Sequence, residues 1–141
     1  MSTIKVDTYL TRGGASEIAI DKLKGASSAG SMLVVGEGGT VTPNLQQGLA
    51  KTWIQFNGTG TIATQDSFGV GSLTDNNTGN YSIGFTNNMA NNDYASAGIG
   101  NTAGMASEAV TTSALNALCF NSSGSNNDVT IISAMIQGDL A

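Results

Sequence analysis

The sequence predicts an all-β protein whose body is an antiparallel sandwich or barrel, of which we favour a jelly-roll-like β-sandwich, preceded by an N-terminal β-hairpin arm. Short segments that alternate apolar and polar residues recur along the chain, and clusters of Gly, Asn, Ser and Thr separate them. No long segment has a convincing helical period. Charged residues make up only 11% of the 141 residues, against about 25% in average proteins. High polarity without charge is typical of short strands and many turns rather than of disorder.

The first 48 residues are predicted to form the arm. Residues 2–11, STIKVDTYLT, alternate so that Ile4, Val6 and Leu10 share one face. After a Gly-Gly turn, residues 16–20 repeat the alternation, and the two segments together predict a hairpin. A third strand is expected at SMLVVG (31–36), and the segment with the only proline is expected to form a loop or a brief helical turn.

Charge divides the chain into two parts. The first 51 residues hold all five basic residues and four acidic ones, a balance of +1, whereas the rest holds six acidic residues and no basic one. This division predicts two functional regions, an arm at 1–48 and a body at 49–141. Because phosphate binding needs clustered Lys and Arg, the body is not expected to bind nucleic acid or an anionic membrane.

The body opens with alternating strands. In KTWIQFNG (51–58) the side chains of Trp53 and Gln55 face opposite to those of Ile54 and Phe56. The segment 61–74 is predicted to be one strand, followed by a turn at 75–79 in which Asn and Gly adopt positive φ angles. The predicted core comprises Trp53, Ile54, Phe56, Phe68, Val70, Tyr81, Ile83, Phe85, Val129 and Ile131.

The last third of the chain is harder to interpret. Residues 90–107 are rich in small side chains and have a weak pattern. Residues 108–124 fit either a helix or a strand, and the β-branched start with the NSSGSNN terminator favours the strand. Residues 128–139 are apolar on both faces, which predicts a central strand or one covered by another subunit. The scarcity of large apolar side chains also favours partner subunits that complete the core.

Residues that carry catalysis or bind metals are scarce. The chain has no histidine, which excludes Ser-His-Asp and Cys-His sites and His-containing zinc sites. Its single cysteine, Cys119, excludes an intrachain disulfide or a thiolate metal cluster and is expected to be a small buried residue. The acidic residues of the body are scattered, and Asp66 with Asp75 is the only moderately close pair, which we assign to the surface. We therefore predict no catalytic residue, no cofactor and no metal site, and so no enzyme.

Two kinds of loop segment have compositions found in ligand sites, but neither is predicted to bind a ligand. The segment 75–79 offers one carboxylate, whereas a calcium loop needs several, so a turn is favoured. The GTG and GVG triplets lack the spacing of a phosphate loop and fit strand ends and bulges. For sugar binding by an exposed aromatic ring, Tyr94 is the best candidate, because it lies among small and polar residues. We expect no signal peptide and no membrane span.

One segment, AKTWIQFNGTGTIATQDSFGVGSLTDNNTGNYSIGFTNNMANNDYA (50–95), resembles the C-terminal β-sandwich module of bacteriophage tail fibres and virion fibre proteins. The resemblance is carried by Trp53, Phe56, Asn57, Gly58, Thr59, Gly60, Phe68, Val70, Asp75, Gly79, Tyr81, Phe85 and Tyr94. The STIKVDTYLT segment is similar to STxKVDTI-type segments of phage fibre proteins. This resemblance implies a virion protein, usually a homotrimer, without cofactor or catalysis.

The resemblance leads to an expected role and an alternative. The expected role is a homotrimeric structural protein on the surface of the virion, either a short fibre or a capsid decoration protein, in contact with other capsid or tail proteins. We expect this chain to lack the large N-terminal docking domain and long shaft of full-length fibres. The alternative is an adhesin that recognises a host-surface glycan through the loops around residues 87–107 and 121–128.

Overall fold

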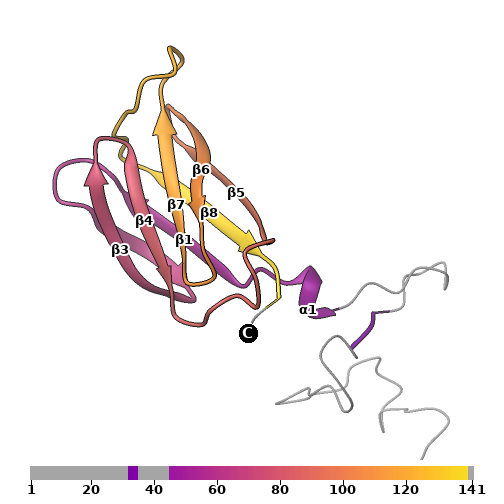
Figure 1. Ribbon diagram of the computed structural model, residues 1–141. Coiled ribbons are helices and arrows are strands. Elements are labelled where there is room, and N and C mark those ends of the chain that lie inside the picture. The colour runs from indigo at the N-terminus through magenta and orange to yellow at the C-terminus, as the bar shows by residue number, and fades with distance from the viewer. Residues whose placement is uncertain (1–31, 35–44, 140–141) are drawn as a thin grey trace, which may run out of the picture.

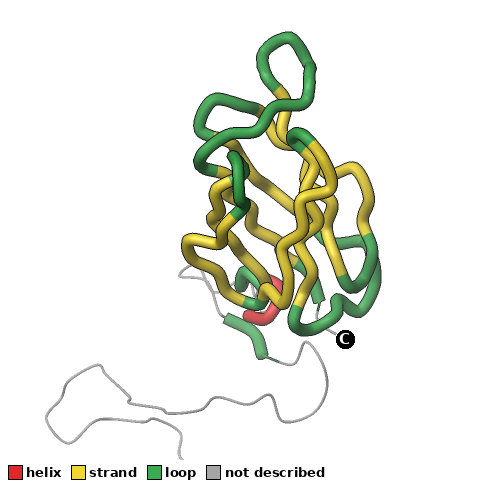
Figure 2. Tube along the Cα trace, turned by 90° about the vertical axis from the view of Figure 1, so that its left-hand side faces the viewer, coloured by secondary structure: helices red, strands yellow, loops and turns green. Residues whose placement is uncertain are grey.

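The computed structural model describes residues 32–34 and 45–139 of the chain, and these form two antiparallel four-stranded sheets that face each other (Figures 1 and 2). A helical turn, α1 (Leu45–Gly48), precedes the sheets, as predicted for the proline-containing segment. The strands are β1 (Thr52–Asn57), β2 (Ala63–Phe68), β3 (Val70–Asn77), β4 (Asn80–Phe85), β5 (Ala95–Gly100), β6 (Gly104–Val110), β7 (Ala114–Phe120) and β8 (Ile132–Gln137). The predicted hairpin at 2–11 and 16–20 lies outside the described residues, as do residues 31, 35 and 36 of the strand predicted at 31–36.

The strand order confirms a sandwich and departs from a jelly roll. The first sheet has the order β2-β1-β8-β5 and the second has the order β3-β4-β7-β6. The first and last strands, β1 and β8, are neighbours, as in a jelly roll. Three hairpins, however, join neighbours within a sheet: β1–β2, β3–β4 and β6–β7. A jelly roll wraps between its sheets at most connections, so the predicted jelly-roll order is wrong.

The segment 61–74, predicted as one strand, is two strands that belong to different sheets. Strand β2 ends at Phe68 and β3 begins at Val70, so Gly69 alone makes the passage. Its φ angle of 72° lies in the left-handed region that favours glycine. A Cβ atom there would also lie 2.7 Å from the carbonyl oxygen of Lys51. The sharp change of direction therefore requires glycine for two reasons, a backbone angle and a close approach.

The core lies between the sheets and is built from alternating inward side chains. Strand β4 shows the pattern most clearly, with Tyr81, Ile83 and Phe85 buried as predicted. Strand β1 contributes Ile54 and Phe56, and the ring of Phe56 meets that of Tyr81 edge to face at a centroid distance of 5.1 Å. The predicted burial of Val129 is also confirmed, and Val70 is partly buried against the same core.

Three predicted core residues are instead exposed: Trp53, Phe68 and Ile131, at 36%, 57% and 41% of their surface. Trp53 lies between inward-facing residues of β1, and alternation therefore directs it to the outer face of the first sheet. Phe68 is its cross-strand partner and shares that face. Ile131 precedes the buried Ile132 and points the other way. Large apolar character alone suggested burial, and the strand register overrules it.

Strands replace the weak and ambiguous patterns near the C-terminus. Residues 90–107 contain β5 and the beginning of β6, and residues 114–120 form β7 with strict alternation of buried and half-buried positions. The favoured strand interpretation of 108–124 is therefore confirmed for residues 114–120, whereas residues 108–110 belong to β6. Strand β8 lies between β1 and β5, which confirms the prediction of a central strand.

The half-buried carboxylate of Asp128 connects three segments of the sandwich at one end. Oδ1 of Asp128 accepts hydrogen bonds from the amide of Gly79 at 2.6 Å and from the hydroxyl group of Tyr81 at 2.7 Å. That hydroxyl also lies 2.9 Å from the carbonyl oxygen of Gly58. Gly79 is in the β3–β4 turn and has a φ angle of 65°. The predicted turn is thus confined to residues 78–79, and no asparagine among the described residues has a positive φ angle.

Candidate functional site

The outer face of the first sheet is the most unusual surface of the described chain. Strand register places its outward side chains in two parallel rows that cross the strands. One row runs Phe68, Trp53, Met135, Ala97 and is wholly apolar. The other runs Asp66, Gln55, Ser133, Ile99 and is mixed. Antiparallel pairing fixes both rows, because residues opposite each other share a face.

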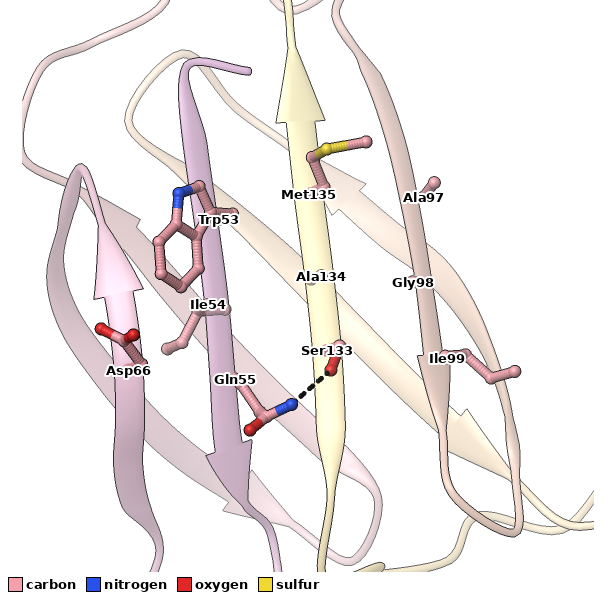
Figure 3. Close-up of a pocket in the computed structure, with 10 residues that line it drawn as sticks. All are labelled: Trp53, Ile54, Gln55, Asp66, Ala97, Gly98, Ile99, Ser133, Ala134 and Met135. Atoms are coloured by element: carbon pink, nitrogen blue, oxygen red, sulfur yellow. Dashed lines mark hydrogen bonds between the residues drawn. The ribbon is translucent and has the colours of Figure 1, made fainter.

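Between the two rows lies an open hollow of about 610 Å³. Its floor is formed by the backbone of residues whose side chains point inward, Ile54 and Ala134, together with Gly98. Figure 3 shows the indole of Trp53 lying over β1 on the side of Asp66, with Met135 and Ile99 projecting beside the hollow. On β5, Ala97 and Gly98 project little from the sheet, so the face is shallow beside them.

The polar groups at the hollow already have hydrogen-bond partners. Nε2 of Gln55 lies 3.4 Å from Oγ of Ser133, the contact dashed in Figure 3. Oδ1 of Asp66 accepts a hydrogen bond from the amide of Ser67 at 2.8 Å. Among the residues that line the hollow, Asp66 alone carries a charge. The hollow is therefore nearly neutral, and only three polar side chains line it: Gln55, Asp66 and Ser133.

Every exposed large hydrophobic residue of the described chain lies on this face or on the segment leading to it. We call the first group the apolar face: Trp53, Phe68, Ile99, Ile131 and Met135. We call the second group the approach segment: Leu33, Val34 and Leu49. The amide of Leu45 donates to the carbonyl oxygen of Met32 at 2.8 Å, which holds residues 32–34 beside α1. The residues of the apolar face share one side of the sandwich, and such a concentration marks an interaction surface.

The outer face of the second sheet has the opposite chemistry. Nδ2 of Asn76 donates to Oδ1 of Asn80 at 3.0 Å and to Oγ of Ser82 at 2.9 Å. The hydroxyl of Ser82 in turn donates to Oδ1 of Asn116 at 2.6 Å. These side chains satisfy one another across β3, β4 and β7. The apolar outward residues of β7, Leu118 and Phe120, are half-buried rather than exposed. This face is suited to water.

Tyr94, the predicted ligand contact, is part of the framework. Its hydroxyl lies 2.9 Å from the carbonyl oxygen of Thr111 and 3.0 Å from that of Ala114. Its ring meets that of Phe85 edge to face at 5.6 Å. Burial raises the pKa of the hydroxyl, although the hydrogen bond to Thr111 acts in the opposite direction. The ligand role stays a prediction, but these contacts already explain why tyrosine is present.

The remaining reactive groups do not converge. Asp66 and Asp75 belong to different sheets, β2 of the first and β3 of the second. Cys119 is fully buried, as expected, and burial raises the pKa of its thiol to about 11, with a smaller contribution from Asp128. Within the part of the chain that the structure describes, no group of three or more Cys, Asp or Glu could hold a metal ion. No helix in that part is long and apolar enough to cross a membrane.

A second hollow, of about 550 Å³, lies at one end of the sandwich. The β5–β6 turn at residues 101–103 and the loop at 121–124 form most of it, and Ile99 and Phe120 contribute apolar surface. The structure thus brings together parts of the two loop regions that the sequence suggested for glycan recognition. Tyr94 is not among the residues that line this hollow.

Sequence reasoning did not identify Ile99 as part of a surface. For residues 128–139, which include Met135 and are apolar on both faces, it predicted either a central strand or one covered by another subunit. Strand β8 lies between β1 and β5, and its inner side is buried in the core. Its apolar outer side has no cover among the described residues. A strand that is apolar on both faces needs cover on both.

Comparisons with protein-family models, with curated protein sequences and with solved structures find no match. The fold and the apolar face are therefore argued from the residues of this chain alone. The resemblance to phage fibre modules stays a prediction.

Proposed function

We propose that this chain is a non-enzymatic structural protein of a bacteriophage virion, a homotrimeric short fibre or capsid decoration protein on the particle surface. Residues 1–48 serve attachment and trimer contacts, and the sandwich forms the body. Its partners are copies of itself and other capsid or tail proteins. The resemblance of residues 50–95 to fibre modules motivates the particle assignment.

One observation supports an assembly role above all: the two outer faces of the sandwich differ in chemistry. The second sheet presents hydrogen-bonded Asn and Ser side chains, whereas the first presents five exposed large hydrophobic residues. The exposed apolar residues of the first sheet do not stabilise a free monomer, because exposed apolar surface costs free energy in water. A building block with one face to solvent and one face to its neighbours has this asymmetry.

The available side chains support a role without catalysis. General acid–base chemistry would need histidine or converging carboxylates, and the sequence has no histidine. The two carboxylates that sequence spacing brought closest, Asp66 and Asp75, lie on separate sheets. Hydrolysis of a glycan would need two acids on either side of one bond.

Mass photometry of the full chain and a reconstruction of the particle together test the proposal. We expect a species of three chains in solution and density for the sandwich on the capsid or the tail. A stable, folded monomer at all concentrations would contradict the trimer. A particle without the chain would contradict the structural role itself.

A second candidate is an adhesin for a neutral host-surface glycan, and the hollow at the end of the sandwich favours it. Phe120 gives that hollow an aromatic wall, and Asn101, Thr102, Asn121 and Ser122 line it with amide and hydroxyl groups. Binding of the full chain to a glycan array, lost in Phe120→Ala and kept in Trp53→Ala, would support this role. No binding to host cells or their polysaccharide would remove it.

A further inference from the structure

We propose that the apolar face of the first sheet packs against further copies of this chain, so that Trp53 and Met135 of each copy are buried in the assembly. This inference rests on the proposed assembly role and deepens it, because it locates the contact and names its occupant.

The need for cover follows from how the face is built. Phe68, Ile99 and Met135 keep 57%, 65% and 43% of their surface exposed, and they lie within two adjacent cross-strand rows. Scattered apolar residues are ordinary on a protein surface, but a contiguous group of this kind marks a site of association. Aromatic residues and Met, which gather here, are also the types enriched in protein interfaces.

A copy of the chain fits this face better than a saccharide does. A sugar would need several hydrogen-bond groups beside the indole, and Gln55, Asp66 and Ser133 are the only polar side chains that line this hollow. A charged protein partner would need complementary charge, and the hollow contains only Asp66. Identical faces can meet here with little repulsion, because Asp66 lies on the edge strand β2 rather than at the centre.

The relief of the face also suits contact between copies. Trp53, Met135 and Ile99 form the raised parts, and the hollow above the backbone of Ile54 and Ala134 forms the depressed part. One face therefore holds both projections and a recess that can receive projections from its neighbour. Apolar sheet faces pack at a spacing of about 10 Å through interdigitating side chains of this kind.

The size of the face favours more than one contact per copy. Four strands of about six residues cover roughly 19 Å by 20 Å, a flat footprint of about 400 Å². A stable interface buries about 800 Å² on each partner. In a closed ring of three copies each chain also makes two contacts, which compensates for a small single one.

The sole tryptophan of the chain reports directly on this face. Trp53 is the only such residue, so its emission maximum and its quenching by acrylamide measure cover at this site alone. For the full chain, we expect shielded, blue-shifted emission while the protein is oligomeric. When the protein is diluted until mass photometry shows monomers, the Trp53 emission should shift to the red. Its quenching by acrylamide should increase over the same concentration range.

Two variants on the face and one control test the contact. Met135→Lys and Ile99→Lys place a charge on the apolar face, where both side chains are exposed within a single chain. Each should raise the concentration of half-dissociation at least about 30-fold and expose Trp53. Thr74→Lys puts the same charge at an exposed position on the outer face of the second sheet and should change neither readout. Circular dichroism of all three shows whether the sandwich is intact.

Each outcome decides the inference. An oligomer that loses mass and Trp53 shielding in both face variants, but not in the control, supports it. An oligomer unaffected by either face variant overturns it and leaves the proposed homotrimer standing. A monomer with exposed Trp53 overturns both the inference and the trimer. A monomer with shielded Trp53 overturns the inference in favour of cover by residues of the same chain.

Discussion

The hydroxyl group of Tyr81 and the carboxylate of Asp128 lie 2.7 Å apart, and this contact joins the core strand β4 to the connection that leads into β8. The same carboxylate oxygen holds the amide of Gly79 in the β3–β4 turn. Burial, and then the hydrogen bond to Asp128, raise the pKa of Tyr81 well above its ordinary value. Tyr81 therefore stays protonated and able to donate at any physiological pH.

Removal of this hydroxyl should destabilise the protein measurably. We expect Tyr81→Phe to lower the free energy of unfolding by about 1–3 kcal/mol, because acceptors on Asp128 and Gly58 lose their donor. Urea denaturation at fixed protein concentration measures the change. In a double-mutant cycle with Asp128→Asn, the two effects should fall short of additivity, since the residues share one contact. Full additivity would show that they act separately.

Tyr94 should behave as a framework residue. Tyr94→Phe keeps the ring contact with Phe85 and loses the hydrogen bonds to Thr111 and Ala114, so a loss of about 1 kcal/mol is expected. Tyr94→Ala also loses the ring packing and should cost about 2–4 kcal/mol. Thermal unfolding of the two variants gives the comparison. If Tyr94→Ala is as stable as the unmodified protein, the framework role is contradicted and a ligand role becomes the better explanation of this tyrosine.

The passage between the sheets should tolerate only glycine. Gly69→Ala forces a side chain into the left-handed region and against the carbonyl oxygen of Lys51, and we expect a loss of at least about 2 kcal/mol. Gly60 is the matched control, since its φ angle is 63° and a Cβ there meets no atom within 4 Å. Gly60→Ala should cost only about 1 kcal/mol. Similar losses for both would mean that the close approach at Gly69 relaxes.

Alkaline pH should weaken the fold through Cys119. Its thiol has a pKa of about 11 in the folded chain, above about 8.5 when unfolded. The folded state thus holds the proton more tightly, and stability falls as pH rises from about 8.5 to 11. Cys119→Ala should flatten this fall between pH 8.5 and 10, as followed by urea denaturation. Above about pH 10 Tyr81 and Tyr94, whose pKa values are also raised, lower the stability in either form.

An unchanged slope in Cys119→Ala would assign the alkaline loss to other groups. The substitution should itself cost about 1 kcal/mol below pH 8, because it leaves a small cavity beside the core. That constant offset is distinct from a change in slope. The comparison therefore separates packing from titration.

Strand periodicity predicted much of the sandwich, because alternation in one strand depends only on local register. The buried faces of β1 and β4 follow directly from TWIQFN and NYSIGF. The predicted fit of the GVG triplet to a strand end or bulge is confirmed, since Gly69 directly follows β2 and the β3 register shifts between Val70 and Ser72. Local composition can indicate such features, because a positive φ angle favours glycine.

Strand order and the exposed face could not be predicted in the same way. The pairing of Thr52 with Ile136 joins residues far apart in the sequence, and no local pattern specifies it. Trp53 and Phe68 were assigned to the core because large aromatic residues are usually buried. Their exposure depends on which side of the sheet the second sheet covers, a property of the tertiary arrangement. The sequence predicts that Trp53 and Ile54 point to opposite faces of the strand, but it does not show which of the two faces is covered.

The position of β8 sets an order on how the chain can acquire its structure. The second sheet uses only strands between residues 70 and 120, so it can form while the following residues are still being synthesised. The first sheet cannot close until β8 inserts between β1 and β5, because it is the only link between them. Met135 arrives with that strand. The surface proposed to join copies is therefore complete only when β8 is in place between β1 and β5.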